Sequence, residues 1–267
     1  MVLRHFFTLF LFLLLFSPHP LIADSYWQQK LPDQPMDFIF GYGSLMNSES
    51  RKSTAGRMTV AIPVRISAAF GYRRAWVFRA GSMGFTALGL EKETPQAPAS
   101  TINGVIYPVN DQELAAFDKR ESGYDRVAVP LEQIEAVGWL PLPKQGRFWL
   151  YLPKVSTLAK RGAHRASASH PLVQSYIDLC VRGALEHGEA FAEEFLQTTY
   201  GWSRWWLNDR QQPRRPWVHQ KWFRSVDKLL KRFPQDEARR TYAQRKRPVE
   251  FAMQRMTEGR DRKFHAE

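Results

Sequence analysis

The sequence contains little cysteine and no internal repeat. One cysteine among 267 residues excludes an internal disulfide framework and a cysteine-rich zinc site. No segment recurs at a period of about 20–50 residues, which excludes solenoids and propellers. The seven histidines show no H-E-x-x-H or other paired-ligand spacing, so we expect no metal site. Hydrophobic residues make up 44% and charged residues 24%, which is globular composition and excludes a wholly disordered chain.

The net positive charge of the body of the chain is small, and most of the net charge lies at the C-terminal end. Of the net charge of +12, residues 203–267 carry +10, from 18 Lys and Arg against 8 Asp and Glu. We therefore predict a Trp- and Arg-rich, partly helical basic extension over residues 201–267. Its simplest interpretation is a packed extension or a solvated tail, while a lid or a contact with an anionic membrane surface stays open. We expect no nucleic acid partner.

The N-terminus has the pattern of an export signal. One arginine precedes an apolar run at 6–16, two prolines break it, and Ala23 stands before Asp24. A basic start, a short apolar run and a small residue at the cleavage point are typical of a secretory signal. The sequence predicts a signal peptide over 1–23 and an exported protein, periplasmic or secreted. An uncleaved membrane anchor at 6–16 is the alternative, although a spanning helix needs about 20 apolar residues.

The rest of the chain changes from strand-like to helical patterns. Short apolar runs predict strands at 37–42, 60–66, 72–79, 84–90, 103–109, 124–131 and 147–152. Helical spacing predicts helices at 111–121, 171–187 and 189–199, and the polar stretch after Ser44 is helical in character. Cys180 lies on the apolar face of the helix at 171–187, where we expect a buried thiol. Strands followed by helices favour a mixed α+β domain.

A first candidate motif is Phe40-Gly41-Tyr42-Gly43-Ser44-Leu45-Met46. Glycines on both sides of Tyr42 and a serine at a helix start predict a strand-to-helix turn whose backbone approaches a ligand closely. Free N–H groups there suit a carboxylate or a developing oxyanion. An ordinary tight turn with Ser44 as helix cap is the alternative. The motif lacks the lysine of a phosphate loop and the third glycine of a dinucleotide loop.

The second candidate motif is the run from Phe117 to Arg126, FDKRESGYDR. A helix is predicted to end near Glu121, Gly123 makes the turn and Tyr124 begins a strand. A carboxylate at such a helix end, aimed into a cleft, can accept and donate a proton. A surface network, in which Lys119 and the neighbouring arginines offset the acidic side chains, is the alternative.

In this order, with Glu121 77 positions after Ser44, the two motifs resemble those of the γ-glutamylcyclotransferase-like family. That family includes the ChaC glutathione-degrading enzymes and the AIG2-like proteins. The resemblance extends more weakly to the helix at 170–188 and covers about residues 37–200. It implies a small mixed β-barrel flanked by helices as one domain, with neither metal nor organic cofactor. Met46-Asn47 departs from the glutathione-specific branch and is closer to the AIG2-like branch.

The resemblance also implies a reaction and roles for residues. Family members release 5-oxoproline from a γ-glutamyl peptide or amine, by attack of the substrate's α-amine on its own γ-carbonyl. Carried over by motif position, Glu121 is the acid/base, and the backbone at Gly43, Ser44 and Leu45 binds the glutamyl part. We add Tyr42 and Tyr124 as walls of the pocket. The alternatives are a non-catalytic binding protein of the same fold, or a membrane-surface protein that acts through its basic tail.

Overall fold

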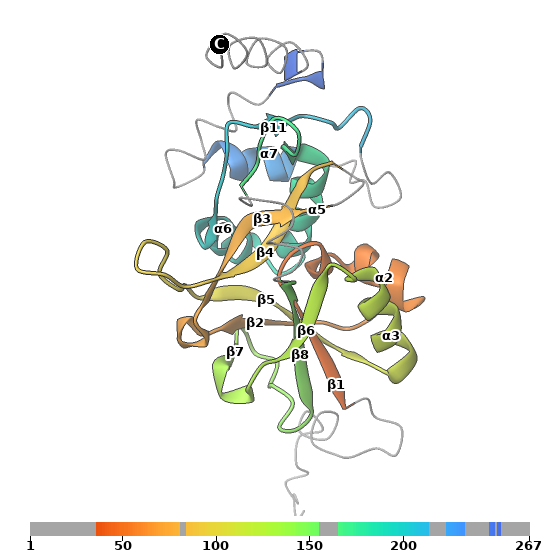
Figure 1. The fold of residues 1–267 in the computed structure, drawn as a ribbon. Helices are drawn as coiled ribbons and strands as arrows, with labels where there is room; N and C mark the ends of the chain where they lie inside the picture. Colours follow the sequence, from red (N-terminus) through yellow and green to blue (C-terminus); the bar gives the residue numbers. More distant parts are fainter. Residues whose placement is uncertain are drawn as a thin grey trace, which may run out of the picture.

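A computed structural model describes residues 36–80, 84–154, 165–213, 223–232, 246–248 and 250–251. The predicted signal peptide or anchor lies outside these residues, as does most of the charged tail after residue 235, so both stay predictions. The described chain combines one large sheet, two small sheets and helices packed beside them (Figure 1). The mixed α+β class predicted from the sequence is confirmed.

The largest sheet has six strands in the order β6-β8-β1-β5-β2-β7. All its neighbours pair antiparallel except β1 and β8, which run parallel. Its strands are β1 (Asp37–Gly41), β2 (Ile62–Ile66), β5 (Ile102–Val109), β6 (Tyr124–Ala128), β7 (Ile134–Ala136) and β8 (Arg147–Pro153). Because β6 and β7 are the edges of this order, the described strands form an open sheet. The closed barrel implied by the resemblance is not found among them.

Two smaller sheets connect the second half of the chain to the first. One has the order β10-β3-β4, and the other pairs β11 with β9. Their strands are β3 (Tyr72–Arg79), β4 (Thr86–Lys92), β9 (Leu172–Val173), β10 (Thr199–Tyr200) and β11 (Trp206–Leu207). In both sheets, a strand from beyond residue 198 pairs in parallel with an earlier one. The start of the Trp-rich extension is therefore built into the sheets.

The helices lie beside and between the sheets (Figure 1). They are η2 (Ser44–Met46), α2 (Ser48–Ala55), η3 (Ala68–Phe70), α3 (Asp111–Arg120), η5 (Leu131–Gln133), α5 (Gln174–Leu185), α6 (Glu189–Gln197) and α7 (Arg224–Lys231), where η denotes a 3₁₀ turn. None of the described helices is both long and apolar enough to cross a membrane. The apolar stripes of α5, α6 and α7 contribute Ile177, Phe195 and Leu230 to the core, as amphipathic spacing requires.

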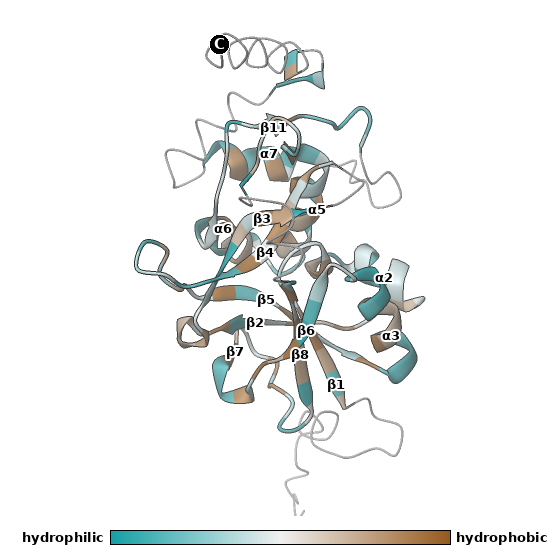
Figure 2. Cartoon of the chain, viewed as in Figure 1, coloured by the Kyte–Doolittle hydropathy of each residue, from teal (hydrophilic) through white to brown (hydrophobic). Residues whose placement is uncertain are grey.

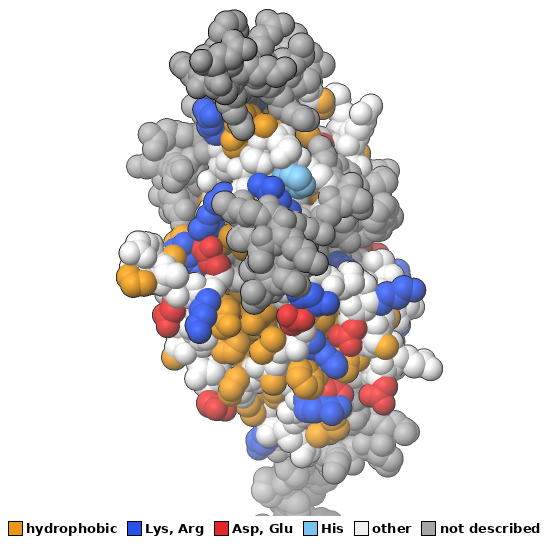
Figure 3. All heavy atoms as spheres, in the orientation of Figure 1, with side chains coloured by type: hydrophobic (Ala, Val, Ile, Leu, Met, Phe, Trp, Pro, Cys, Tyr) orange, Lys and Arg blue, Asp and Glu red, His pale blue; other side chains and the backbone are white. Residues whose placement is uncertain are grey.

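Apolar side chains of both halves form one continuous core. In Figure 2 the most hydrophobic segments are central strands, whereas α7 alternates between hydrophobic and hydrophilic residues. Figure 3 shows apolar side chains gathered on the visible face over β6, β7 and β8, with charged side chains around them. Cys180 is fully buried, as predicted.

Two helix starts differ from the prediction. The chain after Ser44 forms only a three-residue 3₁₀ turn, and α2 begins at Ser48, where Asn47 supplies the cap by accepting from the Ser50 N–H. The later helix begins at Gln174 rather than Pro171, because Leu172 and Val173 pair as β9 with β11. The short strands β7, β9, β10 and β11 were not predicted, whereas α7 lies in the extension that was predicted to be partly helical. β7 has only three residues, too few to show a period.

Candidate functional site

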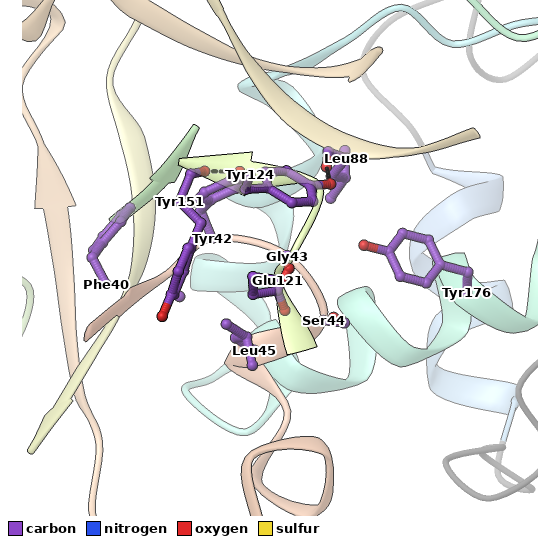
Figure 4. Close-up of a pocket in the computed structure, with 11 residues that line it drawn as sticks. Phe40, Tyr42, Gly43, Ser44, Leu45, Leu88, Glu121, Tyr124, Tyr151 and Tyr176 are labelled. Atoms are coloured by element: carbon purple, nitrogen blue, oxygen red, sulfur yellow. Dashed lines mark hydrogen bonds between the residues drawn. The ribbon is translucent and has the colours of Figure 1, made fainter. Parts of the chain in front are cut away.

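A pocket opens where the end of β1 meets the end of α3 (Figure 4). Its described lining combines backbone of the glycine turn, aromatic rings and one carboxylate. The lining residues are Phe40, Gly41, Tyr42, Gly43, Ser44, Leu45, Leu88, Glu121, Tyr124, Tyr151 and Tyr176. All six residues that the sequence singled out are among them. The two motifs, which are 77 residues apart in the chain, thus share one cavity.

The glycine turn presents backbone to this pocket. β1 ends at Gly41, where a Cβ would lie 2.8 Å from the Cβ of Leu45, so only glycine lets the chain fold back this tightly. The turn's own hydrogen bonding begins with Met46, whose N–H donates to the Gly43 carbonyl at 3.0 Å. The N–H groups of Ser44 and Leu45 therefore have no acceptor within the turn. Because no α-helix starts here, these amides and not a long helix dipole would bind an anion.

The carboxylate of Glu121 enters from the end of α3. This helix starts with a capping box, in which Asn110 and Glu113 each accept from the other's backbone N–H. It ends at Glu121, whose N–H donates to the Phe117 carbonyl at 2.8 Å. The next turn needs Gly123, because a Cβ there would lie 2.5 Å from the ring of Phe78. The Glu121 side chain is only 16% exposed.

Arg120 connects Glu121 with the glycine turn, a role that sequence reasoning missed. Its Nε lies 3.0 Å from the Glu121 carboxylate, and its Nη2 donates to the Ser44 hydroxyl at 3.1 Å. The other guanidinium hydrogen bonds go to Ser50 and Thr54 of α2. The alternative of a charge network holds in part, because Arg120 pairs with Glu121 and Arg126 with Asp118, but Arg120 is largely buried and also contacts the glycine turn. An arginine fork that satisfies several acceptors holds them in a fixed arrangement.

Three tyrosines, from β6, β8 and the glycine turn after β1, form one wall of the pocket (Figure 4). The hydroxyl of Tyr42 donates to the Tyr151 carbonyl at 2.6 Å, and that of Tyr124 donates to the Leu88 carbonyl at 2.8 Å. Tyr151 in turn donates to Asp118 at 2.9 Å. Burial, followed by the nearby charge of Glu121, raises the pKa of Tyr42 well above its ordinary value. These tyrosines are therefore neutral at physiological pH, and Tyr42 and Tyr124 direct their hydroxyl hydrogens to backbone.

Tyr176 closes the opposite side of the pocket and was not predicted. It comes from the first turn of α5, and Figure 4 shows its hydroxyl directed toward Glu121 and Gly43. A Cβ on Gly43 would lie 3.6 Å from that hydroxyl oxygen. No motif marks this tyrosine, because in sequence it is one more large residue on a buried helix. Only the packing of α5 against the turn brings it to the pocket.

Arg74 places a buried positive charge behind the turn. It is fully buried, and its guanidinium donates to the carbonyls of Tyr42 (3.3 Å) and Asn103 (2.6 Å), with further bonds to the hydroxyls of Thr198 and Thr199. Burial lowers the pKa of Arg74 to about 9, so the side chain stays charged at neutral pH. Among the described residues, no group of three or more His, Cys, Asp or Glu side chains is arranged to hold a metal ion.

Comparisons with known proteins locate the family signal in the first part of the chain. A family model described as gamma-glutamyl cyclotransferase, AIG2-like, matches residues 39–169. No curated protein sequence matches the chain. Among solved structures, one named gamma-glutamyl cyclotransferase is 17% identical with a TM-score of 0.43, over 59% of this chain and 85% of its own. An uncharacterized protein from Homo sapiens is 18% identical with a TM-score of 0.42 over the same shares.

A third structure, the gamma-glutamyl cyclotransferase specific to glutathione from yeast, is 16% identical with a TM-score of 0.31, over 43% of this chain and 68% of its own. These three likenesses are distant. The family model spans both motifs of the pocket, from β1 through Glu121 to β8. Residues 39–169, hereafter the family segment, are thus similar to the gamma-glutamyl cyclotransferase, AIG2-like family.

Proposed function

We propose that this protein converts a γ-glutamyl peptide or amine into 5-oxoproline and the free amine, with Glu121 as acid/base. The observation that carries the proposal is the meeting of Glu121 with the Gly43–Leu45 turn in one pocket. A carboxylate that moves protons and amides that polarise a carbonyl are the two elements that this cyclisation needs. The family assignment supports the same reaction class.

The reaction balances without a co-reactant. The substrate's α-amine nitrogen bonds to its own γ-carbonyl carbon, and the bond from that carbon to the leaving nitrogen breaks. Glu121 takes a proton from the attacking amine and gives it to the leaving nitrogen, so the carboxylate is regenerated. Because the nucleophile belongs to the substrate, the pocket mainly has to hold a folded conformation, which contributes up to about 7–11 kcal/mol in ideal intramolecular cases.

The charges around the pocket suit such a substrate. The free N–H groups of Ser44 and Leu45 would receive the substrate's carboxylate or the developing oxyanion, with the buried charge of Arg74 behind the turn. Arg120 keeps Glu121 oriented through the contact of its Nε with the carboxylate at 3.0 Å. Tyr42 and Tyr124, held by their hydroxyl bonds, form apolar walls beside the reacting atoms and exclude water from them.

The decisive experiment measures 5-oxoproline released from a panel of γ-glutamyl peptides and amines by the purified protein. We expect Glu121→Gln to lower the rate about 10²–10⁴-fold, the usual contribution of a general acid/base, with an unchanged melting temperature. Asp125→Asn, at an exposed carboxylate four residues further on, is the matched control and should retain full activity. Wild-type release that survives Glu121→Gln would overturn the assignment of this residue.

The proposal leaves two points to experiment, namely whether the protein is catalytic and where it acts. Binding of γ-glutamyl compounds without any 5-oxoproline would identify a non-catalytic protein of the same fold. Export after removal of residues 1–23, or anchoring by residues 6–16, would bring the enzyme to γ-glutamyl compounds outside the cytosol, where the basic tail could contact anionic membrane. Salt-sensitive retention on anionic vesicles that depends on residues 235–267 and survives Glu121→Gln would reveal that second activity.

A further inference from the structure

The wall of the pocket that carries Tyr176 depends on residues beyond the family segment. Tyr176 is the third residue of α5, and α5 begins directly after the short strand β9. β9 pairs in parallel with β11, and the Leu172 N–H donates to the Trp205 carbonyl at 2.8 Å. The backbone that leads into Tyr176 is therefore held by the start of the Trp-rich extension.

The first turn of α5 takes its cap from the same extension. The residue at the cap position is Val173, which has no side-chain acceptor, and the first turn contains no acidic residue. Asp209 supplies the acceptor and the negative charge, since its carboxylate accepts from the Ser175 N–H at 2.8 Å and from the Ser175 hydroxyl at 2.6 Å. A carboxylate at a helix N-terminus satisfies a free N–H and interacts favourably with the helix dipole.

Two more side chains of the extension hold the residues around Tyr176. Trp206 Nε1 donates to the Gln174 side chain at 3.1 Å, and Gln174 donates to Asp178 at 2.9 Å. Arg210 makes a two-pronged bond to the fully buried Asp178, at 2.7 and 2.8 Å. Gln174 and Ser175 before Tyr176, and Asp178 after it, are thus each bonded to the segment 206–210.

The ring of Tyr176 is packed by aromatic side chains on its core side. Trp76 makes an edge contact with Tyr176, with ring centroids 6.0 Å apart, and Phe85 lies 5.2 Å away. Trp202 of the extension packs against the other side of Trp76 at 5.2 Å and stacks on Trp206. Ring packing of this kind restricts the tyrosine to one direction, which leads into the pocket.

We propose that residues 202–210 are a positioning element of the pocket, which acts by fixing the first turn of α5 and with it Tyr176. The inference rests on the proposed function for its kinetic consequence. Tyr176 faces the glycine turn that would hold the glutamyl part, so displacing it should weaken substrate binding more than it slows the chemistry at Glu121. Asp209 is the sharpest point to test, because it contacts α5 and does not line the pocket.

The kinetic test compares two buried carboxylates. Asp209→Ala should raise KM for the best γ-glutamyl substrate about tenfold, with kcat within twofold of the wild-type value. Asp209→Asn, which keeps an acceptor oxygen, should bring KM most of the way back to the wild-type value. Asp37→Ala removes a similarly bonded carboxylate at the other end of β1, about 13 Å along the strand from Gly41, and should leave KM unchanged. In a Tyr176→Ala background, Asp209→Ala should change KM no further. Equal KM effects of Asp209→Ala and Asp37→Ala, or additive effects with Tyr176→Ala, would overturn the proposal.

A second test is independent of activity. Protein carrying 3-fluorotyrosine gives one fluorine resonance for each of its nine tyrosines, and Tyr176→Phe identifies that of Tyr176. Asp209→Ala should shift this resonance, whereas Asp37→Ala should not. If wild-type protein released no 5-oxoproline, the proposed function would fail, yet the fluorine spectrum would still decide whether Asp209 positions Tyr176. An unmoved Tyr176 resonance in Asp209→Ala refutes the positioning role.

Discussion

The family segment, residues 39–169, and the chain after it contribute to the pocket in different ways. The first region supplies the glycine turn, Glu121 and every other described lining residue except Tyr176. The second region supplies Tyr176 and then holds it through buried contacts of Asp209, Arg210 and two tryptophans. The comparison teaches that the groups proposed to act in the reaction lie in short local turns, whereas the wall opposite them depends on a network spread over residues 172–210.

Removing residues 201–267 is the largest perturbation of this comparison. It exposes Trp76, takes the cap from α5 and leaves the buried Asp178 without Arg210. An uncompensated buried charge costs about 3–5 kcal/mol, and losing two buried tryptophans adds a similar amount each, which exceeds the stability of many domains. We expect a chain that does not fold, measured by circular dichroism and urea unfolding. A cooperative transition at the full-length midpoint would show that residues 37–200 are self-sufficient.

Arg210→Ala tests the central bond between the two regions. Arg210 connects Asp178 of α5 with Asp227 of α7, and although burial alone would lower its pKa, these hydrogen bonds raise it above the ordinary value. The variant should lose about 3–5 kcal/mol of unfolding free energy, because a buried carboxylate stays unpaired. Combining it with Asp178→Asn should restore part of that loss. Urea denaturation measures both, and a double variant no more stable than the single one would contradict the pairing argument.

Gly183→Ala tests how closely the two regions approach. Gly183 of α5 lies against the backbone of Met46 and Asn47, directly after the glycine turn, and a Cβ there would come within 2.7 Å of the Met46 carbonyl carbon. Alanine normally stabilises a helix by about 1 kcal/mol relative to glycine. Here we expect a net loss of about 1–3 kcal/mol, since α5 must move away from the turn. A raised melting temperature would mean that this contact is not tight.

The smallest expected difference between the two regions is in their stability at acid pH. Burial, followed by the charge of Arg51, lowers the pKa of His187 at the end of α5 to about 4. Because an unfolded histidine titrates near 6.5, its contribution is complete above that pH and is lost as the pH falls toward 4. We expect the unfolding free energy to fall by about 1 kcal/mol over this pH range, a small value because the ring is partly exposed. His187→Gln should abolish this part of the pH dependence.

The control for this pH effect lies in the first region. Burial raises the pKa of Asp37, but hydrogen bonds from Arg147 and Trp149 outweigh it and hold the pKa below its ordinary value. Its contribution is therefore present above the unfolded pKa and persists until the pH falls through the lower folded pKa. As the pH falls from 6.5 to 4, the end of α5 should lose its protection against hydrogen exchange before the start of β1 does. The opposite order would contradict these assignments.

Prediction from sequence succeeded where local chemistry decides the outcome. The glycines around Tyr42, the cap at Asn110 and the helix end at Glu121 each act within a few residues, so the turn and the carboxylate could be found, and they share one pocket. It failed for the closed barrel, which depends on which strands remain at the sheet edges and so on neighbours distant in the chain. The stretch after Ser44 is helical as predicted, but α2 starts at Ser48, because Asn47 and not Ser44 supplies its cap. The roles proposed for the site residues stay predictions.

The sequence by itself determined the strands, the main helices and the two motifs, because alternating or helical spacing and special backbone positions are properties of neighbouring residues. Tertiary structure alone decided that Arg120 connects Glu121 with Ser44, that Arg74 is buried behind the turn and that Tyr176 faces it. The contacts with the turn join residues separated by 32 positions (Arg74 to Tyr42) or more, and no local pattern records them. Burial and close packing, which depend on the whole chain at once, make those choices.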